Sequence, residues 1–475
     1  MNKSFKRIKI SLTSLALLVF CISSLQAQQN TPEFKELRKS QQNFVDLGFG
    51  MFIHYNIPTY MDDDWPDPNA SPEIFNPDDL DTDQWARAAK SAKMTYGVLT
   101  TKHHSGFCIW DTKTTDYNVM NSPYKKDIVK QYVDSFRKEG LNVSLYYSIL
   151  DTHHEIRPGK ITPDKIQMIK DQITELLTNY GKVDALIIDG WDAPWSRISY
   201  DDVPFEDIYR LVKSLQPECL LLDLNAAKYP SEALFYTDIK SYEQGAGQKI
   251  SKEYNKLPAV SMLPIQETWF WKPRFPTQDL RDPEDLVNNN IIPFNNAYCN
   301  FLLNVAPNRH GKIDNNALIT LEKIGNIWKP DNSKIVSLPD YDAPIISSNL
   351  AKNKPTKSSW SDQMWLMDFA NDDDFQTSWI SYRSVEKPWW EVEFEKEQAF
   401  DAIVITESNE NVHDYTIEYM VNNKWVKLLD GNILDKVKIH RFPQVWGNKV
   451  RIKFNGFNSP PRIAEVGIYN ERNRN

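Results

Sequence analysis

The sequence predicts an α/β protein of two domains, a (β/α)8-like TIM barrel followed by an all-β jelly-roll sandwich. Its 475 residues exceed what a single hydrophobic core usually organises. Short apolar runs alternate with helical patterns from about residue 48 to residue 327. Beyond residue 343 the hydrophobic period changes to two, which is typical of antiparallel strands.

The first 27 residues are predicted to be a signal peptide. Basic residues precede a short apolar run at 10–20, and Ala27 lies at the expected cleavage site. The run is too short to span a bilayer, and no other segment is apolar enough to do so. We therefore expect export to the periplasm or the extracellular space. A lipid anchor on Cys21 is the alternative, although Phe20 stands where that signal prefers a small residue.

Residues 28–330 are expected to form the barrel. Eight apolar runs are predicted strands, at 48–53, 96–101, 141–147, 183–188, 219–224, 234–240, 259–263 and 301–305. Helical spacing of apolar residues predicts helices at 81–94, 127–140, 163–180, 205–215 and 283–298. Continuous apolar strands joined by helices indicate a parallel sheet covered on its outside. An open doubly wound sheet is the alternative, but it would show a glycine-rich phosphate loop after the first strand, which this sequence lacks.

Residues 331–343 are rich in Pro, Asp and Ser and are predicted to be a linker. In residues 344–475, alternating segments such as 389–394, 402–405 and 450–454 predict the strands of an antiparallel sandwich.

Composition excludes several classes of function. The net charge of −9 argues against a partner bound through a nucleic-acid backbone, which would require clustered Lys and Arg. Outside the predicted signal, the three cysteines Cys108, Cys219 and Cys299 are widely spaced. They match neither a disulfide framework nor a zinc pattern.

Polar residues that follow predicted strands are the candidates for chemistry, because barrels place their working residues at the carboxyl ends of strands. These residues are His54, Lys102, His103, His104, Tyr146, Tyr147, Asp189, Asp223, Glu243 and Glu267. Adjacent histidines such as His103 and His104 are also common as hydrogen-bonded core residues.

Asp189 is the most informative of these residues, because a carboxylate directly after an apolar strand is partly desolvated. A helix N-cap is the alternative role for such an Asp. Hydrolysis of a glycosidic bond needs two carboxyl groups, and Glu243 or Glu267 could supply the second. A metal-dependent hydrolase would also use His and Asp at strand ends, but the closely spaced histidine pairs that it usually needs are missing.

Several sequence blocks resemble the α-L-fucosidases of glycoside hydrolase family 29. The longest runs from Leu99 to Trp110 and contains Lys102-His103-His104 followed by Gly106-Phe107. The other blocks are Phe52 to Tyr55, Thr115 to Tyr117, Asp127 to Val129, Leu145 to Ser148, Asp189-Gly190 and Phe301 to Pro307. Together they cover most of residues 44–330.

This resemblance implies a retaining exo-hydrolase that removes terminal fucose from oligosaccharides or glycoconjugates without a cofactor. Asp189 falls on the nucleophile of the family. His54, His103, His104 and Tyr147 fall on residues that bind the hydroxyl groups of fucose, and Trp110 falls on an aromatic residue of the sugar pocket. Glu243 is the expected general acid, with Glu267 as the alternative.

The chain departs from the family pattern at Ser105, Asn56, Ile188 and Asn225, where the family usually has Asp, Gly, an aromatic residue and Arg. These changes leave two alternatives open. One is a glycan-binding protein without activity, and the other is a glycosidase for a related sugar such as L-galactose.

The C-terminal residues resemble discoidin, or coagulation factor 5/8 type C, domains. Asp374 to Trp379, Trp389 to Val392 and Ile463 to Val466 carry this resemblance. It implies a module that can bind carbohydrate. It also suggests a structural calcium ion, for which Asp372, Asp373 and Asp374 could supply oxygen atoms, a solvated acidic loop being the alternative.

Overall fold

The computed structural model describes residues 32–330, 336–432 and 434–471. The chain divides into two compact units whose boundary lies between Ser348 and Asn349. The predicted signal peptide lies outside the described residues. No helix in the described ranges is long and apolar enough to cross a membrane.

The first unit is built around a sheet of eight parallel strands, which bends into a nearly closed barrel. The strands are β1 (Phe49–Ile53), β2 (Tyr96–Lys102), β3 (Asn142–Ser148), β4 (Ala185–Asp189), β5 (Leu220–Asp223), β6 (Lys240–Glu243), β7 (Ala259–Pro264) and β8 (Cys299–Asn304). Their order is β5-β4-β3-β2-β1-β8-β7-β6. A backbone hydrogen bond from Asp238 N to Leu221 O (2.8 Å) bridges the two edges just before β6. The predicted TIM-like barrel is therefore confirmed.

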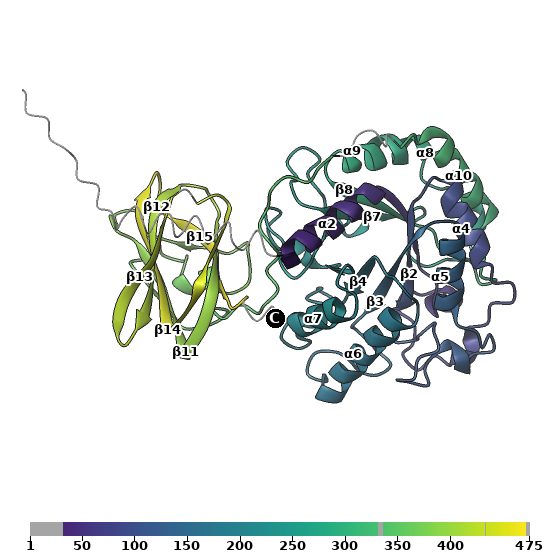
Figure 1. Ribbon diagram of the computed structural model, residues 1–475, viewed down its shortest axis with the longest axis horizontal. Coiled ribbons are helices and arrows are strands. Elements are labelled where there is room, and N and C mark those ends of the chain that lie inside the picture. Colours follow the sequence, from purple (N-terminus) through teal and green to yellow (C-terminus); the bar gives the residue numbers. More distant parts are fainter. Residues whose placement is uncertain (1–31, 331–335, 433, 472–475) are drawn as a thin grey trace, which may run out of the picture. The chain divides into compact units, whose positions relative to one another are not determined.

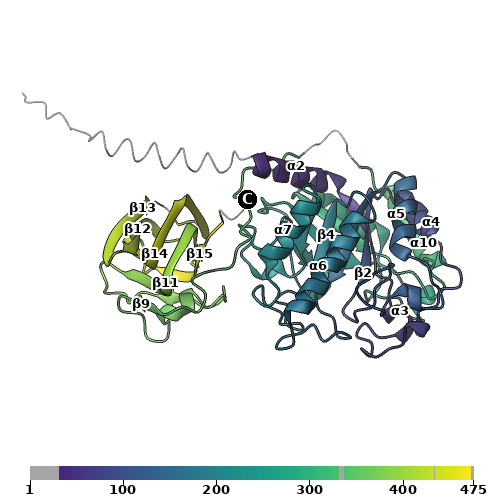
Figure 2. The ribbon, with the colours of Figure 1, turned by 60° about the horizontal axis from the view of Figure 1, so that its bottom comes forward.

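Helices surround this sheet, and Figures 1 and 2 show α4 to α7 outside β2 to β4. They are α2 (Pro32–Leu47), α3 (Pro58–Met61), α4 (Thr82–Ser91), α5 (Ile128–Lys138), α6 (Pro163–Thr178), α7 (Phe205–Leu215), α8 (Pro283–Asp285), α9 (Ile292–Asn295) and α10 (Asn315–Ile327). Aspartates cap α4 and α5, among others. Asp81 accepts a hydrogen bond from Gln84 N (2.8 Å) and Asp127 accepts one from Lys130 N (2.7 Å).

Two predicted elements differ from the structure. The sixth strand was expected at 234–240 but runs from Lys240 to Glu243, so Glu243 ends the strand instead of following it. The helix expected at 283–298 is divided by a π-helical turn, Leu286–Ile291, between α8 and α9. Pro293 lies at the start of α9 and has no N–H, so a regular helix through this point would lose a hydrogen bond.

The inward-facing side chains of the strands form the interior of the barrel. One buried cluster contains alternate residues of the strands, among them Tyr146 of β3 and both Ala185 and Ile187 of β4. Because side chains alternate along a strand, Asp189 lies on the same inward side as Ala185 and Ile187. Tyr147, which pairs with Ile188, faces the other way.

Part of the expected linker packs against α2. Tyr341 Oη donates to Gln41 Oε1 (2.6 Å), and Leu338 N donates to Gln42 Oε1 (2.8 Å). Both Leu338 and Tyr341 are buried.

The second unit is an antiparallel β-sandwich, as predicted. Its strands are β9 (Thr356–Ser358), β10 (Trp379–Ile380), β11 (Trp389–Glu407), β12 (Val412–Val421), β13 (Lys424–Gly431), β14 (Val437–Phe457) and β15 (Arg462–Tyr469). They follow the order β10-β15-β11-β14-β12-β13, with β9 paired to β11. β11 and β14 are long and change register between Glu393 and Gln398. Such irregularities allow a strand to bend around a core, here one that includes Trp379 and Trp390.

Candidate active site

Asp189 is held at the end of β4 by two hydrogen-bond donors. Tyr146 Oη donates to its Oδ2 (2.7 Å) and Asn225 Nδ2 donates to its Oδ1 (3.0 Å). The side chain is buried, and burial raises the pKa of its carboxyl, while these two hydrogen bonds act in the opposite direction. Gly190 follows with φ of 108°, a conformation in which residues with a Cβ are strained. Asp189 is thus fixed in one orientation, with donors that stabilise its charged form.

Glu243 ends β6 and accepts a single side-chain hydrogen bond, from Trp269 Nε1 to Oε1 (3.1 Å). Burial raises the pKa of Glu243 to about 7, and the negative charge of Asp189 contributes to this rise. Two carboxyl groups that influence each other therefore differ in their environment. One is stabilised as an anion by two donors, and the other keeps its proton up to neutral pH, which is the division that acid-base catalysis needs.

Three histidines in neutral form cluster beside Asp189. Burial lowers the pKa of His54 and of His104 to about 3, and it lowers the pKa of His103 well below its ordinary value. The rings of His103 and His104 are 3.9 Å apart between centroids, and those of His54 and His103 are 5.9 Å apart. The three predicted histidines are therefore brought together.

Hydrogen bonds fix the tautomer of two of them. Asn304 Nδ2 donates to Trp269 O (2.8 Å), so its oxygen Oδ1 accepts the hydrogen bond from His54 Nδ1 (2.8 Å). Ser148 Oγ donates to Leu150 O (2.9 Å) and therefore accepts from His104 Nδ1 (2.7 Å). Each Nε2 then carries a lone pair and can accept a hydrogen bond from a hydroxyl group. His104 Nε2 lies 3.7 Å from Asp189 Oδ2, which places one such acceptor directly beside the carboxylate.

Aromatic side chains line the same region. The ring of Trp269 lies 4.9 Å from that of His54, and Phe270 lies 5.2 Å from His54 and 4.8 Å from His103. Trp269 also holds Glu243, so one side chain links the histidines to the second carboxyl group. Planar apolar surfaces beside hydrogen-bonding groups are suited to a sugar, which has both polar edges and an apolar face.

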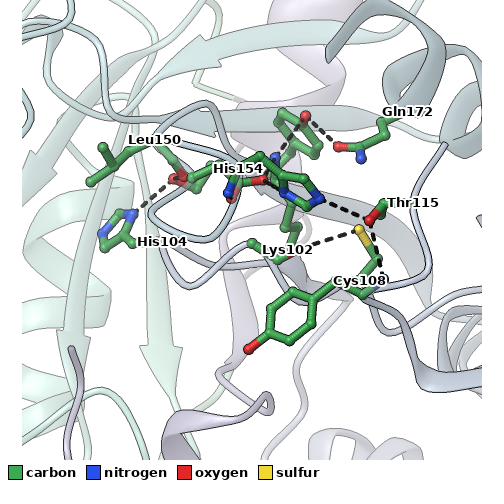
Figure 3. Close-up of polar contacts among 12 residues, drawn as sticks. Lys102, His104, Cys108, Thr115, Leu150, His154 and Gln172 are labelled. Atoms are coloured by element: carbon green, nitrogen blue, oxygen red, sulfur yellow. Dashed lines mark hydrogen bonds and ion pairs between the residues drawn. The ribbon is translucent and has the colours of Figure 1, made fainter. Parts of the chain in front are cut away.

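Tyr147 is not brought to this site. Its hydroxyl donates to Gln172 Oε1 (2.7 Å) on α6 and accepts from Lys102 Nζ (3.0 Å). Lys102 also pairs with Asp151 (3.2 Å), which His154 contacts through Nδ1 (2.8 Å). In Figure 3 Gln172 lies at the right of this network and His104 at the left. This buried network therefore stabilises the segment that carries His103 and His104.

Two more predicted residues also lie elsewhere. Trp110 is fully buried and its Nε1 donates to Glu175 Oε2 (2.9 Å) on α6. Glu267 is exposed, forms an ion pair with Arg274 and accepts a hydrogen bond from Gln278 (2.8 Å). The charge of Asp189 contributes to the raised pKa of Glu243, whereas Glu267 is engaged by Arg274.

The acidic loop of the second unit is engaged by protein donors. Asp372 accepts hydrogen bonds from Thr377 Oγ1 (2.9 Å) and Asp374 N (3.0 Å), and Asp373 pairs with Lys352 (2.9 Å). Within residues 32–330, 336–432 and 434–471, no three His, Cys, Asp or Glu side chains are grouped to hold a metal ion. The calcium site that the resemblance suggested stays a prediction.

Comparison with known families shows to which family the chain belongs. The profile of the α-L-fucosidase family matches residues 65–333, which is more than half of the chain and includes both carboxyl groups. The chain belongs to the α-L-fucosidase family. The protein is accordingly a glycoside hydrolase that cleaves fucosides, and a profile of the F5/8 type C domain matches residues 355–466.

Relatives of this α-L-fucosidase cover nearly its whole length. A relative from Oryza sativa subsp. japonica is 27% identical over 452 residues, covering 89% of this chain and 82% of its own. Alpha-L-fucosidase 1 of Arabidopsis thaliana is 25% identical over 472 residues, covering 92% and 88%. A GH29 fucosidase from Ruminococcus gnavus, solved in complex with fucose, shares the fold with a TM-score of 0.50 and 21% identity. That match covers 91% of this chain and 94% of the other.

The sequence alone assigned no role to three residues of the fucosidase site. Tyr146 could have been chosen over Tyr147 from the alternation of side chains, counted back from Asp189 across the neighbouring strand. Asn225 was noted only as a departure from Arg, although a neutral donor can also hold a carboxylate. Trp269 lies in a loop, and no periodic pattern predicts its contact with Glu243.

Asp223 fixes the position of Asn225 through a hydrogen bond. It accepts hydrogen bonds from Asn225 N (2.9 Å) and from Tyr200 Oη (2.5 Å). Burial raises the pKa of Asp223 to about 7, and the charge of Asp189 adds to this rise. Asn225, which stands where the family usually has Arg, is therefore fixed by the buried carboxyl group of Asp223.

Proposed function

We propose that the protein hydrolyses terminal α-L-fucosides with retention of configuration, through a covalent intermediate on Asp189. The supporting observation is the pairing of two unlike carboxyl groups. Asp189 is oriented by Tyr146 and Asn225, and the charge of Asp189 helps to raise the pKa of Glu243 to about 7. A retaining glycosidase uses one ionised carboxylate and one protonated carboxyl group in this way.

The reaction then runs in two steps. In the first, an oxygen of Asp189 attacks the anomeric carbon, the bond to the leaving oxygen breaks, and Glu243 gives that oxygen its proton. In the second, Glu243 removes a proton from water, the resulting hydroxide attacks the same carbon, and Asp189 leaves. The rise in the pKa of Glu243 makes the first step possible at neutral pH.

The three histidines are assigned to substrate binding. His54 and His104 each have an Nε2 acceptor to which a hydroxyl of the sugar can donate. His103 has a buried Nδ1 that lacks a hydrogen-bond partner in the described part of the chain. A buried polar atom without a partner costs about 1–3 kcal/mol, so a bound sugar that supplies one would gain affinity.

Activity of three alanine variants tests this assignment. Asp189→Ala should lower hydrolysis of an aryl α-L-fucoside by a factor of about 10³ or more, and azide should restore part of it by taking the place of the carboxylate. Glu243→Ala should strongly reduce turnover of substrates with poor leaving groups, whereas Glu267→Ala should not. Near-normal activity of Asp189→Ala would overturn the proposal, and binding without turnover by the unmodified protein would favour a glycan-binding role instead.

We further propose that residues 1–27 direct export to the periplasm or beyond the cell. The basic start, the apolar run at 10–20 and Ala27 support this proposal. The N-terminal sequence of the mature protein, purified from separated cell fractions, is the test. A mature protein that retains Met1 in the cytoplasmic fraction would refute it.

A further inference from the structure

A third buried carboxyl group lies next to the nucleophile and has no part in the two chemical steps. Asp223 ends β5, and its register partner on β4 is Ile188, the residue directly before Asp189. The side chain of Asp223 is completely buried. Because burial of a carboxylate costs free energy unless other groups stabilise its charge, the contacts of Asp223 determine whether it can be charged.

One residue connects Asp223 with Asp189. Asn225 donates through its backbone N–H to Asp223 Oδ1 (2.9 Å) and through its side-chain Nδ2 to Asp189 Oδ1 (3.0 Å). The first of these hydrogen bonds closes an Asx turn at the end of β5, and this turn fixes the backbone from which the Asn225 side chain reaches the nucleophile. The two carboxyl groups, at the ends of adjacent strands, are therefore joined through a single residue.

Both carboxyl oxygens of Asp223 accept hydrogen bonds. Tyr200 Oη donates to Oδ2 (2.5 Å), and Asn225 N donates to Oδ1. These donors stabilise the anion, whereas burial and the charge of Asp189 disfavour it and raise the pKa of Asp223 to about 7. At about pH 8 Asp223 is therefore mainly an anion, beside a second anion at Asp189.

Two lysines interact electrostatically with Asp223, and both are bound to other groups. Lys228 forms an ion pair with Asp192. Lys240 Nζ donates to two backbone carbonyl groups (both 2.8 Å). In the part of the chain that the structure describes, Asp223 itself forms no ion pair. The repulsion between Asp223 and Asp189 is therefore not cancelled by a cation bound to Asp223.

We propose that Asp223 is a positioning residue whose negative charge promotes the first chemical step by repelling that of Asp189. This inference deepens the proposed function and rests on it. When an oxygen of Asp189 bonds to the anomeric carbon and the leaving group departs with its electron pair, Asp189 becomes a neutral ester and the repulsion ends. The repulsion therefore raises the free energy of the enzyme before the first step and accelerates that step.

The same charge retards the second step. As water attacks the anomeric carbon and Glu243 takes its proton, the bond to Asp189 breaks and Asp189 regains a full negative charge beside Asp223. Removal of the charge of Asp223 should therefore have opposite effects on the two steps. Loss of a merely structural contact would instead slow both steps, because it would displace Asn225 and with it the nucleophile.

The test measures the two steps separately in Asp223→Asn at about pH 8, where Asp223 of the unmodified protein is mainly charged. The substitution keeps the shape of the side chain and an oxygen that can accept from Asn225 N. The reagent is a 2-deoxy-2-fluoro-fucosyl fluoride, whose fluoride leaves without a proton from Glu243. The rate constant of inactivation should fall on the order of five-fold, and the rate constant of reactivation should rise by a similar factor.

Three controls make the result interpretable. Asp184→Asn is the matched substitution directly before the other end of β4, and it should change neither rate constant. At about pH 5.5, where Asp223 of the unmodified protein is protonated, Asp223→Asn should have the same rate constants as the unmodified protein. Tyr200→Phe removes a donor to the Asp223 anion and raises its pKa, so the increase of the inactivation rate with pH should move to higher pH.

Rate constants that change in the same direction in Asp223→Asn, or not at all, would overturn the proposal. A difference that persists at the lower pH would do the same. So would an inactivation profile that stays in place in Tyr200→Phe, a measurement that does not depend on the folding of Asp223→Asn. Failure of the reagent to inactivate the unmodified protein, or a label on a residue other than Asp189, would instead refute the proposed function.

Discussion

The hydrogen bond between Trp269 and Glu243 gives a quantitative prediction about pH. Burial and the charge of Asp189 raise the pKa of Glu243, and the hydrogen bond from Trp269 Nε1 to Oε1 (3.1 Å) limits this rise, to about 7, because it stabilises the charged form. A hydrogen bond to a charged group contributes about 1.5–3 kcal/mol, and the low end applies because Glu243 is partly exposed. At 1.36 kcal/mol per unit, Trp269→Phe should raise the pKa of Glu243 by on the order of one unit.

The assay is kcat/KM against pH for a fucosyl disaccharide, whose leaving oxygen needs a proton. A general acid works while protonated, so activity of the unmodified enzyme should decline above about pH 7. In Trp269→Phe this decline should move to higher pH, while the phenyl ring keeps the contact with His54. Trp271→Phe is the matched control, because its indole donates to Asp314 (2.7 Å) instead. A basic limb that stays in place or moves to lower pH in Trp269→Phe would refute Glu243 as the acid.

Three further predictions follow from other contacts. Tyr146→Phe removes a donor to the Asp189 carboxylate and should raise its pKa, so the acidic limb of kcat/KM should move to higher pH; a limb that moves to lower pH would contradict this. Lys102→Met leaves buried Asp151 without its cation and should destabilise the barrel by about 3–5 kcal/mol, measured by chemical denaturation, and a loss below about 1 kcal/mol would show the pair to be dispensable. Gly106→Ala should lower the melting temperature in calorimetry by several degrees, because φ is 87° and the new Cβ would lie 2.1 Å from Asp151 Oδ1; an unchanged transition would show that the loop adapts.

The strands of the barrel were predictable because they are buried on both faces and read as apolar runs. Asp189 could be chosen as a candidate from the same pattern, because it directly follows one of those apolar runs. The sixth strand was misplaced because its residues, Lys240–Glu243, are polar in sequence. Lys240 is buried there only because it donates to the carbonyl groups of Ala226 and Tyr229, which are contacts that sequence periodicity does not encode.

The roles of individual side chains were harder to predict than their position in the chain. Tyr146 and Tyr147 are adjacent and chemically identical, and only the inward or outward side of β3 separates them. Trp110 stands six residues after His104, yet its indole donates to Glu175 on α6. Trp65 and Trp195 meet across loops separated by more than a hundred residues, and loop conformation is not a property of hydrophobic pattern.

The central claim is that Asp189 forms a covalent bond with the sugar during catalysis. The most direct measurement is to trap that adduct with a 2-deoxy-2-fluoro-fucosyl fluoride, digest the protein and locate the label by mass spectrometry. The account predicts one labelled peptide, with the added mass on Asp189 at the end of β4. A label on Glu243, Asp223 or any other carboxyl group would contradict it.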